Sequence, residues 1–259
     1  FENKGRMKRF IVALLTIGAF ASCEREITVV DPAALDDRNI YIRAYKYFDG
    51  DIADTSTVYQ INGDLIKLSH VYITLSGAEF VSVDEKDTTR TDNDLTAIDL
   101  LTTSEVKLAQ LPRGSYNGRL NYHIGLDSAR AYASPETLEE TNPLVKGHLW
   151  NGPATGHSFF QLEGRVFDPN DSLFTTPTST FTWRIATEDM VIERSEKRNF
   201  NVAANKDVFF VIDLDIEKLF LGLQPSSTPE IYSDPGDAAD YNKAQILSDN
   251  LKSEFVFKL

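Results

Sequence analysis

Short stretches in which apolar and polar residues alternate run through most of this chain from residue 38 onward. Residues 40–47 carry β-branched or aromatic side chains at nearly every second position, the period of a strand with one buried face. Shorter apolar runs follow, and Asn62-Gly63 between two of them is typical of a tight hairpin turn. The pattern predicts strands at residues 40–47, 58–61, 65–68, 71–75, 80–83, 94–101, 120–124, 158–166, 181–185, 189–193, 208–214 and 255–259.

Helical periodicity is confined to the C-terminal third. Residues 238–253 place apolar side chains three or four positions apart, with Asp237 before them as the expected N-cap, and residues 216–221 fit one turn. Residues 84–93 are too polar for a core and are expected to form a surface loop. Strands joined by Gly, Pro, Asn and Asp turns predict an all-β fold, an antiparallel β-sandwich with a short C-terminal helix.

The beginning of the chain has the features of an export signal. Met7 is followed by two basic residues and then by an uncharged, mostly apolar run at residues 10–21. A helix of about 12 residues spans roughly 18 Å, too short for a bilayer core of about 30 Å but typical of a signal peptide. Two small residues then precede Cys23, which resembles a bacterial lipobox, with Phe20 where leucine is more usual.

This pattern predicts three parts of the chain. Residues 1–22 are a signal peptide, of which residues 1–6 precede the expected start at Met7, residues 23–37 are a lipidated tether, and residues 38–259 are one β-sandwich domain. Diacylglycerol on Cys23 anchors the protein to a membrane of the bacterial cell envelope, expected to be the outer membrane, with the domain in the periplasm or at the surface. The alternative is a soluble secreted protein with a free thiol, which is less favoured because the one cysteine falls at the cleavage position.

Charge narrows the choice of partners. The whole chain has a formal net charge of −13, and from Cys23 onward 22 basic residues face 38 acidic ones, a charge of −16. Such a surface repels phosphate backbones, so nucleic acid is excluded as an expected partner. It also repels anionic lipid, so attachment to a membrane depends on the acyl chains.

Signatures of common enzymes are missing. The chain has no P-loop, no G-x-G-x-x-G, no G-x-S-x-G and no H-E-x-x-H, and no nucleophile–base pair is visible, so we expect a non-enzymatic protein. Asp49, Asp51 and Asp54 lie close together but lack the glycine and the closing glutamate of an EF-hand, so a solvated turn is favoured over a calcium site.

Four segments in the middle of the chain resemble the MbnP-like family. They read LPRGSY at residues 111–116, YHIGLDS at 122–128, GHLW at 147–150 and GHSFFQLEG at 156–164. Their order and spacing carry the resemblance, and weaker similarity extends over most of the chain after Cys23. Members are β-sandwich proteins of the periplasm or lipid-anchored proteins associated with copper, so the resemblance implies this fold and a role in copper homeostasis.

If copper binds, we expect the site to be built from His148 and His157, with Trp150 beside them and His123 as a further ligand. Imidazole is the best copper ligand that this chain offers. Trp150 matches a family tryptophan that a partner enzyme of diheme peroxidase type can oxidise to kynurenine, which binds copper although indole has no lone pair for a metal. His148 and Trp150 would share one face of a strand, and the Gly/Pro turn after Gly152 would fold His157 back toward them.

The chain departs from the family pattern at three positions. His148 stands where the family has methionine, His157 stands where it has tyrosine, and Arg184 occupies the place of a later histidine. A guanidinium cannot bind a metal, and Glu163 is the expected partner of its charge. Met190 is the only thioether outside the signal peptide, which excludes a copper site of several sulfurs.

The same residues also allow purely structural roles. His123 fits a half-buried strand, His70 fits a turn or strand edge, and Trp150 and Trp183 fit a core. The leading hypothesis is a non-enzymatic, lipid-anchored MbnP-like protein that binds copper. The alternative is a metal-free interaction module, such as a glycan-binding or adhesin-type surface lipoprotein, which aromatic residues aligned on one exposed sheet face would favour.

Overall fold

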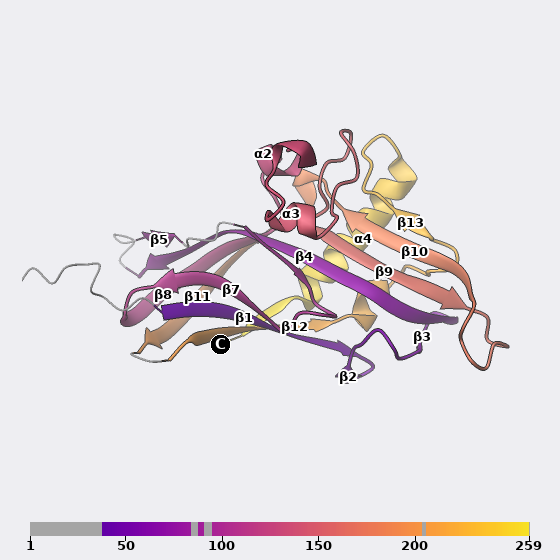
Figure 1. The fold of residues 1–259 in the computed structure, drawn as a ribbon, viewed down its shortest axis with the longest axis horizontal. Helices are drawn as coiled ribbons and strands as arrows, with labels where there is room; N and C mark the ends of the chain where they lie inside the picture. Colours follow the sequence, from indigo (N-terminus) through magenta and orange to yellow (C-terminus); the bar gives the residue numbers. More distant parts are fainter. Residues whose placement is uncertain (1–37, 84–87, 91–94, 204–205, 259) are drawn as a thin grey trace, which may run out of the picture. The chain divides into compact units, whose positions relative to one another are not determined.

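The computed structural model describes residues 38–83, 88–90, 95–203 and 206–258 (Figure 1). The predicted signal peptide, Cys23 and the tether therefore lie outside the described residues. Within the described part of the chain, no helix is both long enough and apolar enough to span a membrane.

Two β-sheets form the domain, as the alternating pattern predicted. One has the order β14-β12-β1-β2, with β7 also paired to β1. Its strands are β1 (Arg38–Phe48), β2 (Asp51–Ile52), β7 (Glu105–Leu111), β12 (Val208–Asp215) and β14 (Val256–Lys258).

The second sheet has the order β11-β8-β4-β9-β10-β13, and β3, β5 and β6 also pair with β4. Its strands are β3 (Tyr59–Ile61), β4 (Asp64–Ser82), β5 (Thr88–Arg90), β6 (Leu95–Asp99), β8 (Gly114–Ile124), β9 (Phe160–Phe167), β10 (Pro177–Ile185), β11 (Ile192–Val202) and β13 (Glu230–Ile231). The predicted all-β sandwich is confirmed. Two of the pairings, β1 with β12 and β10 with β13, are parallel and the others are antiparallel.

The longest strand, β4, joins three runs that the sequence predicted as separate strands. Register shifts between Leu68 and His70 and between Ser76 and Glu79 interrupt its pairing without ending it. The second bulge contains Gly77 at φ +60°, a left-handed conformation that glycine adopts without strain. A bulge interrupts the two-residue alternation of apolar and polar side chains although the strand continues. The sequence pattern therefore predicted three short strands in place of one long one.

Helices are not confined to the C-terminal third, so that prediction was wrong. Residues 125–159, here called the helical insertion, connect β8 to β9 and contain α2 (Ser128–Ala131), η2 (Pro135–Thr137) and α3 (Pro143–Lys146). Figure 1 shows α2 and α3 over the outer side of β4 and β9. Side chains of Asp127 and Asn142 cap the two α-helices, which are too short to give a periodic pattern.

The C-terminal helix is where the periodicity placed it. This helix, α4 (Ala238–Glu254), begins with Asp237 as its N-cap, whose carboxylate accepts the backbone N–H groups of Ala239 and Asp240. The predicted single turn is η4 (Glu217–Phe220), and a further turn, η3 (Glu188–Met190), links β10 to β11.

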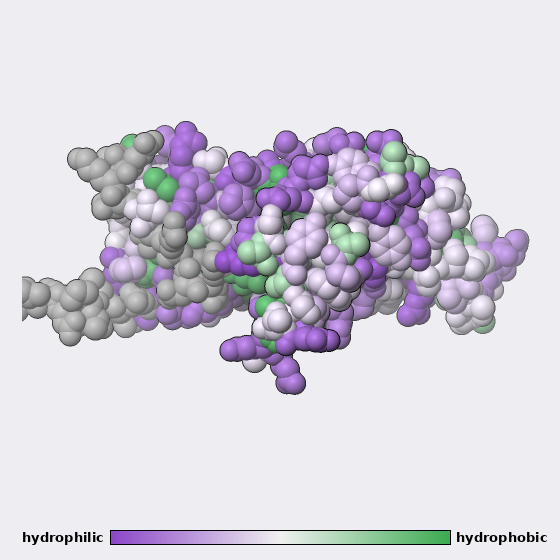
Figure 2. Space-filling model, turned by 90° about the horizontal axis from the view of Figure 1, so that it is seen from above, coloured by the Kyte–Doolittle hydropathy of each residue, from purple (hydrophilic) through white to green (hydrophobic). Residues whose placement is uncertain are grey.

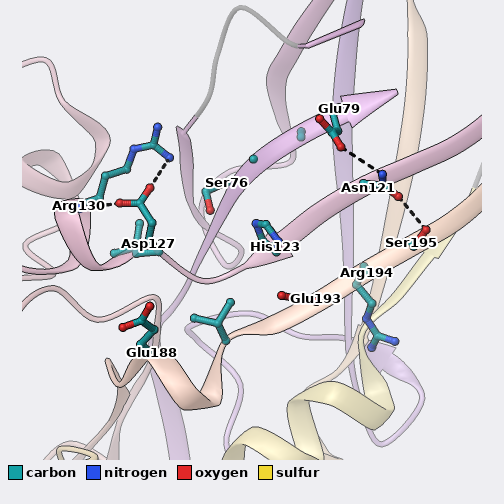
Figure 3. A pocket seen from close by; sticks show the side chains of 14 residues that line it. Ser76, Glu79, Asn121, His123, Asp127, Arg130, Glu188, Glu193, Arg194 and Ser195 are labelled. Carbon is teal, nitrogen blue, oxygen red and sulfur yellow. Dashed lines mark hydrogen bonds and ion pairs between the residues drawn. The ribbon is translucent and has the colours of Figure 1, made fainter. Parts of the chain in front are cut away.

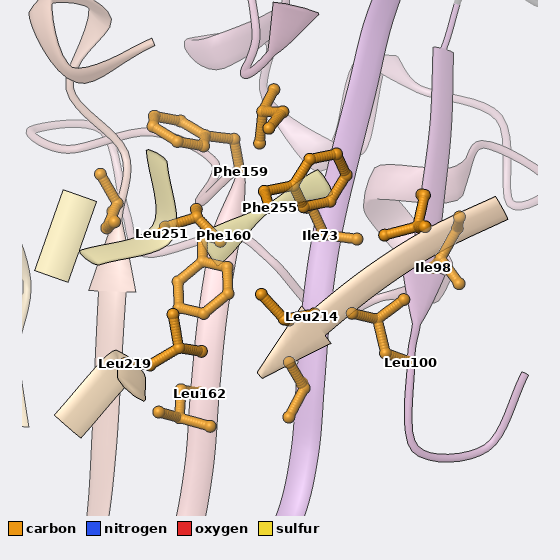
Figure 4. Close-up of a cluster of buried hydrophobic side chains, with 14 of the residues drawn as sticks. Ile73, Ile98, Leu100, Phe159, Phe160, Leu162, Leu214, Leu219, Leu251 and Phe255 are labelled. Carbon is orange, nitrogen blue, oxygen red and sulfur yellow. The ribbon is translucent and has the colours of Figure 1, made fainter. Parts of the chain in front are cut away.

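The core lies between the two sheets and extends under α4. Fully buried side chains from β4, β9, β12, η4 and α4 meet there (Figure 4): Ile73, Leu162, Leu214, Leu219 and Leu251. Each such side chain stabilises the fold by about 1.5–3 kcal/mol. By contrast, the face that carries the helical insertion is mainly hydrophilic, with apolar residues only in small groups (Figure 2).

Candidate functional site

A tight turn in the helical insertion brings two of the predicted site residues together. Trp150 and His157 form an isolated antiparallel bridge, and their ring centroids lie 4.8 Å apart. The turn is closed by hydrogen bonds from the backbone N–H of Asn151 to the Gly156 carbonyl (2.9 Å) and from the N–H of Gly156 to the Gly152 carbonyl (2.8 Å). His157 therefore folds back onto Trp150, as the Gly/Pro turn predicted.

Gly156 allows the insertion to close over the site. It has φ +72°, and a Cβ at this position would lie 2.3 Å from the carbonyl oxygen of Ala131. This close approach lets the backbone N–H of His157 donate to the same oxygen at 2.7 Å. The glycine thus fixes the distance between α2 and the imidazole-bearing segment.

The hydrogen bonding of His157 determines which of its nitrogens has a free lone pair. The side chain is fully buried, and Nε2 lies 2.9 Å from the carbonyl oxygen of Ala133. A carbonyl only accepts, so Nε2 carries the proton and Nδ1 has the lone pair. Nδ1 is buried and has no hydrogen-bond partner among the described residues.

Burial also sets the charge of this imidazole. It lowers the pKa of His157 below its usual value, against the smaller opposing effect of the bond to Ala133. A neutral imidazole with one N–H bound to a carbonyl and the other nitrogen free is the state in which histidine binds metals. His157 therefore fits a metal ligand, and its unpaired Nδ1 is the observation that carries this fit.

His148 does not lie on a strand, and the expectation that it shares a strand face with Trp150 was wrong. It follows Gly147, the C-cap of α3, and its backbone is left-handed at φ +52°. The end of a helix, rather than an extended segment, therefore precedes Trp150. The His148 side chain is exposed, whereas His157 is fully buried.

His123 lies in a different place, a cleft of about 1070 Å³ where β4, β8 and β11 meet the helical insertion (Figure 3). Neither His148 nor His157 lines this cleft. A Cβ at Gly77 would lie 2.8 Å from Nδ1 of His123, so the bulge in β4 leaves room for the ring. The cleft also contains the ion pair of Asp127 with Arg130, at 3.2 Å.

The structure therefore does not assemble the three predicted histidine ligands. Across the described ranges, no three His, Cys, Asp or Glu side chains are arranged to hold one metal ion. His157 is joined to Trp150, His148 is at the surface and His123 is in the cleft.

Arg184 makes the contact expected of it. Its Nη2 lies 3.9 Å from Oε1 of Glu163, and its Nε donates to Oε1 of the buried Gln161 at 3.1 Å. The guanidinium also lies 5.3 Å from the centre of the Tyr232 ring. Gln161 was not singled out from the sequence, although its place two residues before Glu163 on a strand puts both on one face.

A histidine–carboxylate pair was also missed. Nδ1 of His70 lies 2.9 Å from Oδ2 of Asp99, which is 8% exposed. The partner, Asp99, comes from a different strand, 29 residues further along the chain, so no local sequence motif predicts the pair.

Comparison with known proteins gives two findings. The sequence model of the family described as MbnP matches residues 37–234. The solved structure of MbnP from Methylosinus trichosporium is similar in fold, with a TM-score of 0.52 and 13% sequence identity over 86% of this chain and 98% of that one. No curated protein matches this sequence.

Proposed function

This chain belongs to the MbnP family, and from that membership we propose that it is a non-enzymatic, lipid-anchored protein that binds copper in the bacterial cell envelope and serves copper homeostasis. One observation carries the copper proposal. Nδ1 of His157 is a buried imidazole nitrogen without a hydrogen-bond partner in the described part of the chain, and it belongs to a ring packed against Trp150.

Trp150 is the second member of the proposed site. Its indole has no lone pair for a metal, but opening of the ring to kynurenine supplies an amine and carbonyl groups that bind copper. Trp150 is partly exposed, whereas Trp183 is fully buried and donates its Nε1–H to the Thr228 carbonyl. An oxidising partner of diheme peroxidase type can therefore reach Trp150 and not Trp183.

The proposed set of protein ligands is limited to His157 and the oxidised Trp150. His148 is exposed after α3, and His123 faces the cleft. Arg184 does not oppose the proposal, because Glu163 and Gln161 already pair with its guanidinium.

We expect the protein to contain stoichiometric copper when it is purified without chelators from copper-supplied cells of its own host, where the oxidising partner is present. The mass of the Trp150 peptide should match kynurenine. His157→Gln should remove the copper, because it replaces the one imidazole nitrogen that is buried and free to bind among the described residues. Elemental analysis and peptide mass spectrometry measure the two quantities.

His148→Gln separates the proposed ligand set from the one predicted from the sequence. Copper content should be unchanged in this variant, because the side chain is at the surface. Copper-free protein with intact Trp150 would contradict the copper proposal, and so would full copper content in His157→Gln.

One observation favours the alternative, a glycan-binding module. The outward face of β1 carries Tyr41, Tyr45 and Tyr47 at alternating positions, and Phe209 of β12 stacks on Tyr41 with ring centroids 5.5 Å apart. Tyr45 is 38% exposed. Sugars stack on such aromatic rows, so copper-free protein would leave this face as the better candidate for function.

The anchor is tested separately. We expect Cys23→Ala to move the protein from the membrane fraction to the soluble fraction, because the strongly acidic domain has no other attraction for anionic lipid. Cell fractionation with immunoblotting measures this. Ser22→Ala keeps a small residue before the cysteine and should leave the protein in the membrane fraction, whereas membrane-bound Cys23→Ala protein would place the anchor elsewhere.

A further inference from the structure

The pair formed by His70 and Asp99 lies on the outer face of the nine-stranded sheet, on strands β4 and β6. Oδ1 of Asp99 accepts the backbone N–H groups of Val71 and Leu101, each at 3.2 Å. Oδ2 accepts the hydroxyl of Thr102 at 3.1 Å and lies 2.9 Å from Nδ1 of His70. A carboxylate surrounded by donors fixes the proton of His70 on Nδ1, which leaves the lone pair on Nε2.

The imidazole is oriented but not enclosed. Its side chain is 42% exposed, and its ring stacks on Tyr72 with centroids 5.3 Å apart and planes inclined by 15°. The hydrogen bond and the stack hold the ring in one orientation before any ligand arrives, which reduces the entropic cost of binding.

Glu163 lies directly across from His70 on the neighbouring strand β9. Side chains in such a pair have Cβ atoms about 5 Å apart and point to the same face. Oε1 of Glu163 accepts from Nε2 of Gln161 at 2.6 Å and faces Arg184, while Oε2 makes no hydrogen bond among the described residues. An imidazole nitrogen and a carboxylate oxygen are thus available side by side.

We propose that His70 and Glu163 bind a divalent transition metal ion on this face, with Asp99 as the positioning residue behind the imidazole. A metal-bound histidine whose other N–H is held by a carboxylate is the common arrangement in metalloproteins. Imidazole with carboxylate suits Zn²⁺, Cu²⁺ and Ni²⁺. Because no third His, Cys, Asp or Glu converges here in the described residues, water fills the remaining positions and the ion exchanges readily.

Arg184 is the cation in contact with Glu163, with Nη2 3.9 Å from Oε1, and Lys67 and Arg165 form a neighbouring cross-strand pair on the same two strands. Nε of Arg184 is bound to Gln161, and its guanidinium lies over the Tyr232 ring rather than over His70. The site does not depend on the copper proposal, because it shares no residue with the pair of His157 and Trp150.

Zinc titration by calorimetry tests this site in chelator-stripped full-length protein that carries His157→Gln, since this background lacks the other proposed imidazole ligand and Zn²⁺ has no redox chemistry that could alter Trp150. We expect His70→Gln to remove Zn²⁺ binding and Glu163→Gln to weaken it. Asp99→Asn should raise the dissociation constant about 10–100-fold, the usual effect of losing a carboxylate behind a metal-bound histidine. His148→Gln removes another exposed imidazole and should leave the titration unchanged.

Two results would overturn the proposal. One is Zn²⁺ binding by His70→Gln in this background that equals the binding by His157→Gln alone. The other is an Asp99→Asn variant with an unchanged dissociation constant, which would mean that Asp99 only holds the turn at residues 99–102. If Asp99→Asn does not fold, the Cu²⁺ electron paramagnetic resonance spectrum decides, measured with His157 replaced so that it cannot contribute. Imidazole nitrogen coupling that is present in His157→Gln and absent in the double variant His70→Gln with His157→Gln supports the site. Coupling that is the same in both variants refutes it.

Discussion

Replacing Trp183 by alanine is expected to lower the free energy of unfolding by about 3–5 kcal/mol, the range for removing a buried tryptophan or phenylalanine. The side chain is fully buried, and its ring centroid lies 5.3 Å from that of Phe181 and 5.0 Å from that of Phe220. Its Nε1–H donates to the carbonyl of Thr228 at 2.7 Å. The substitution opens a cavity and also leaves a buried carbonyl without its donor.

Urea denaturation followed by circular dichroism measures this loss. Trp183→Phe keeps most of the ring and removes only the donor, so its smaller loss separates the hydrogen bond from the cavity. Trp150→Ala is the matched control, because Trp150 is partly exposed and its bridge to His157 closes a single turn. Equal destabilisation by Trp183→Ala and Trp150→Ala would contradict the different burial of the two tryptophans.

Strands whose two faces differ in polarity could be predicted from the sequence. In β1, Ile40, Ile42 and Ala44 are buried and alternate with exposed or half-buried residues, so the two-residue period is visible. In β11 the face turned toward the core carries Arg194, whose guanidinium donates to the carbonyls of Lys252 and Phe255 at the end of α4. A strand with charged residues on both faces has no such period, and only its beginning was predicted.

At the candidate site, contacts between residues close in sequence could be predicted, whereas contacts between distant residues could not. His157 and Trp150 are seven residues apart and meet through one Gly/Pro turn, which the sequence shows directly. His148 could not be placed, because the four-residue helix before it depends on the cap made by Asn142. The partners of His157 and His70, the Ala133 carbonyl and Asp99, lie 24 and 29 residues away, so only the folded chain reveals them.

Gly164 offers the second large effect, and it gives a physical reason for the glycine that ends the segment GHSFFQLEG. A Cβ here would lie 2.5 Å from two ring atoms of Phe181 and 2.6 Å from the carbonyl oxygen of Lys67, closer than real side chains approach. Gly164 pairs with Phe181 on β10 and with Leu68 on β4, so the main chain cannot move aside without opening the centre of the sheet. We expect Gly164→Ala to destabilise the protein by about 3 kcal/mol or more, at or beyond the upper end of usual overpacking costs.

Thermal and urea unfolding of Gly164→Ala beside Gly114→Ala measure this effect. Gly114 begins β8, and a Cβ there would meet only Tyr116 at 3.8 Å, an ordinary contact, so its substitution should change the free energy of unfolding by no more than about 0.5 kcal/mol. A double substitution, Gly164→Ala with Phe181→Leu, removes the ring but keeps the Lys67 carbonyl. If the double variant is no less stable than Phe181→Leu alone, the ring is the source of the cost; a further loss assigns it to the backbone of β4. Gly164→Ala protein as stable as the Gly114→Ala control would show that β4, β9 and β10 do not approach one another as closely as described.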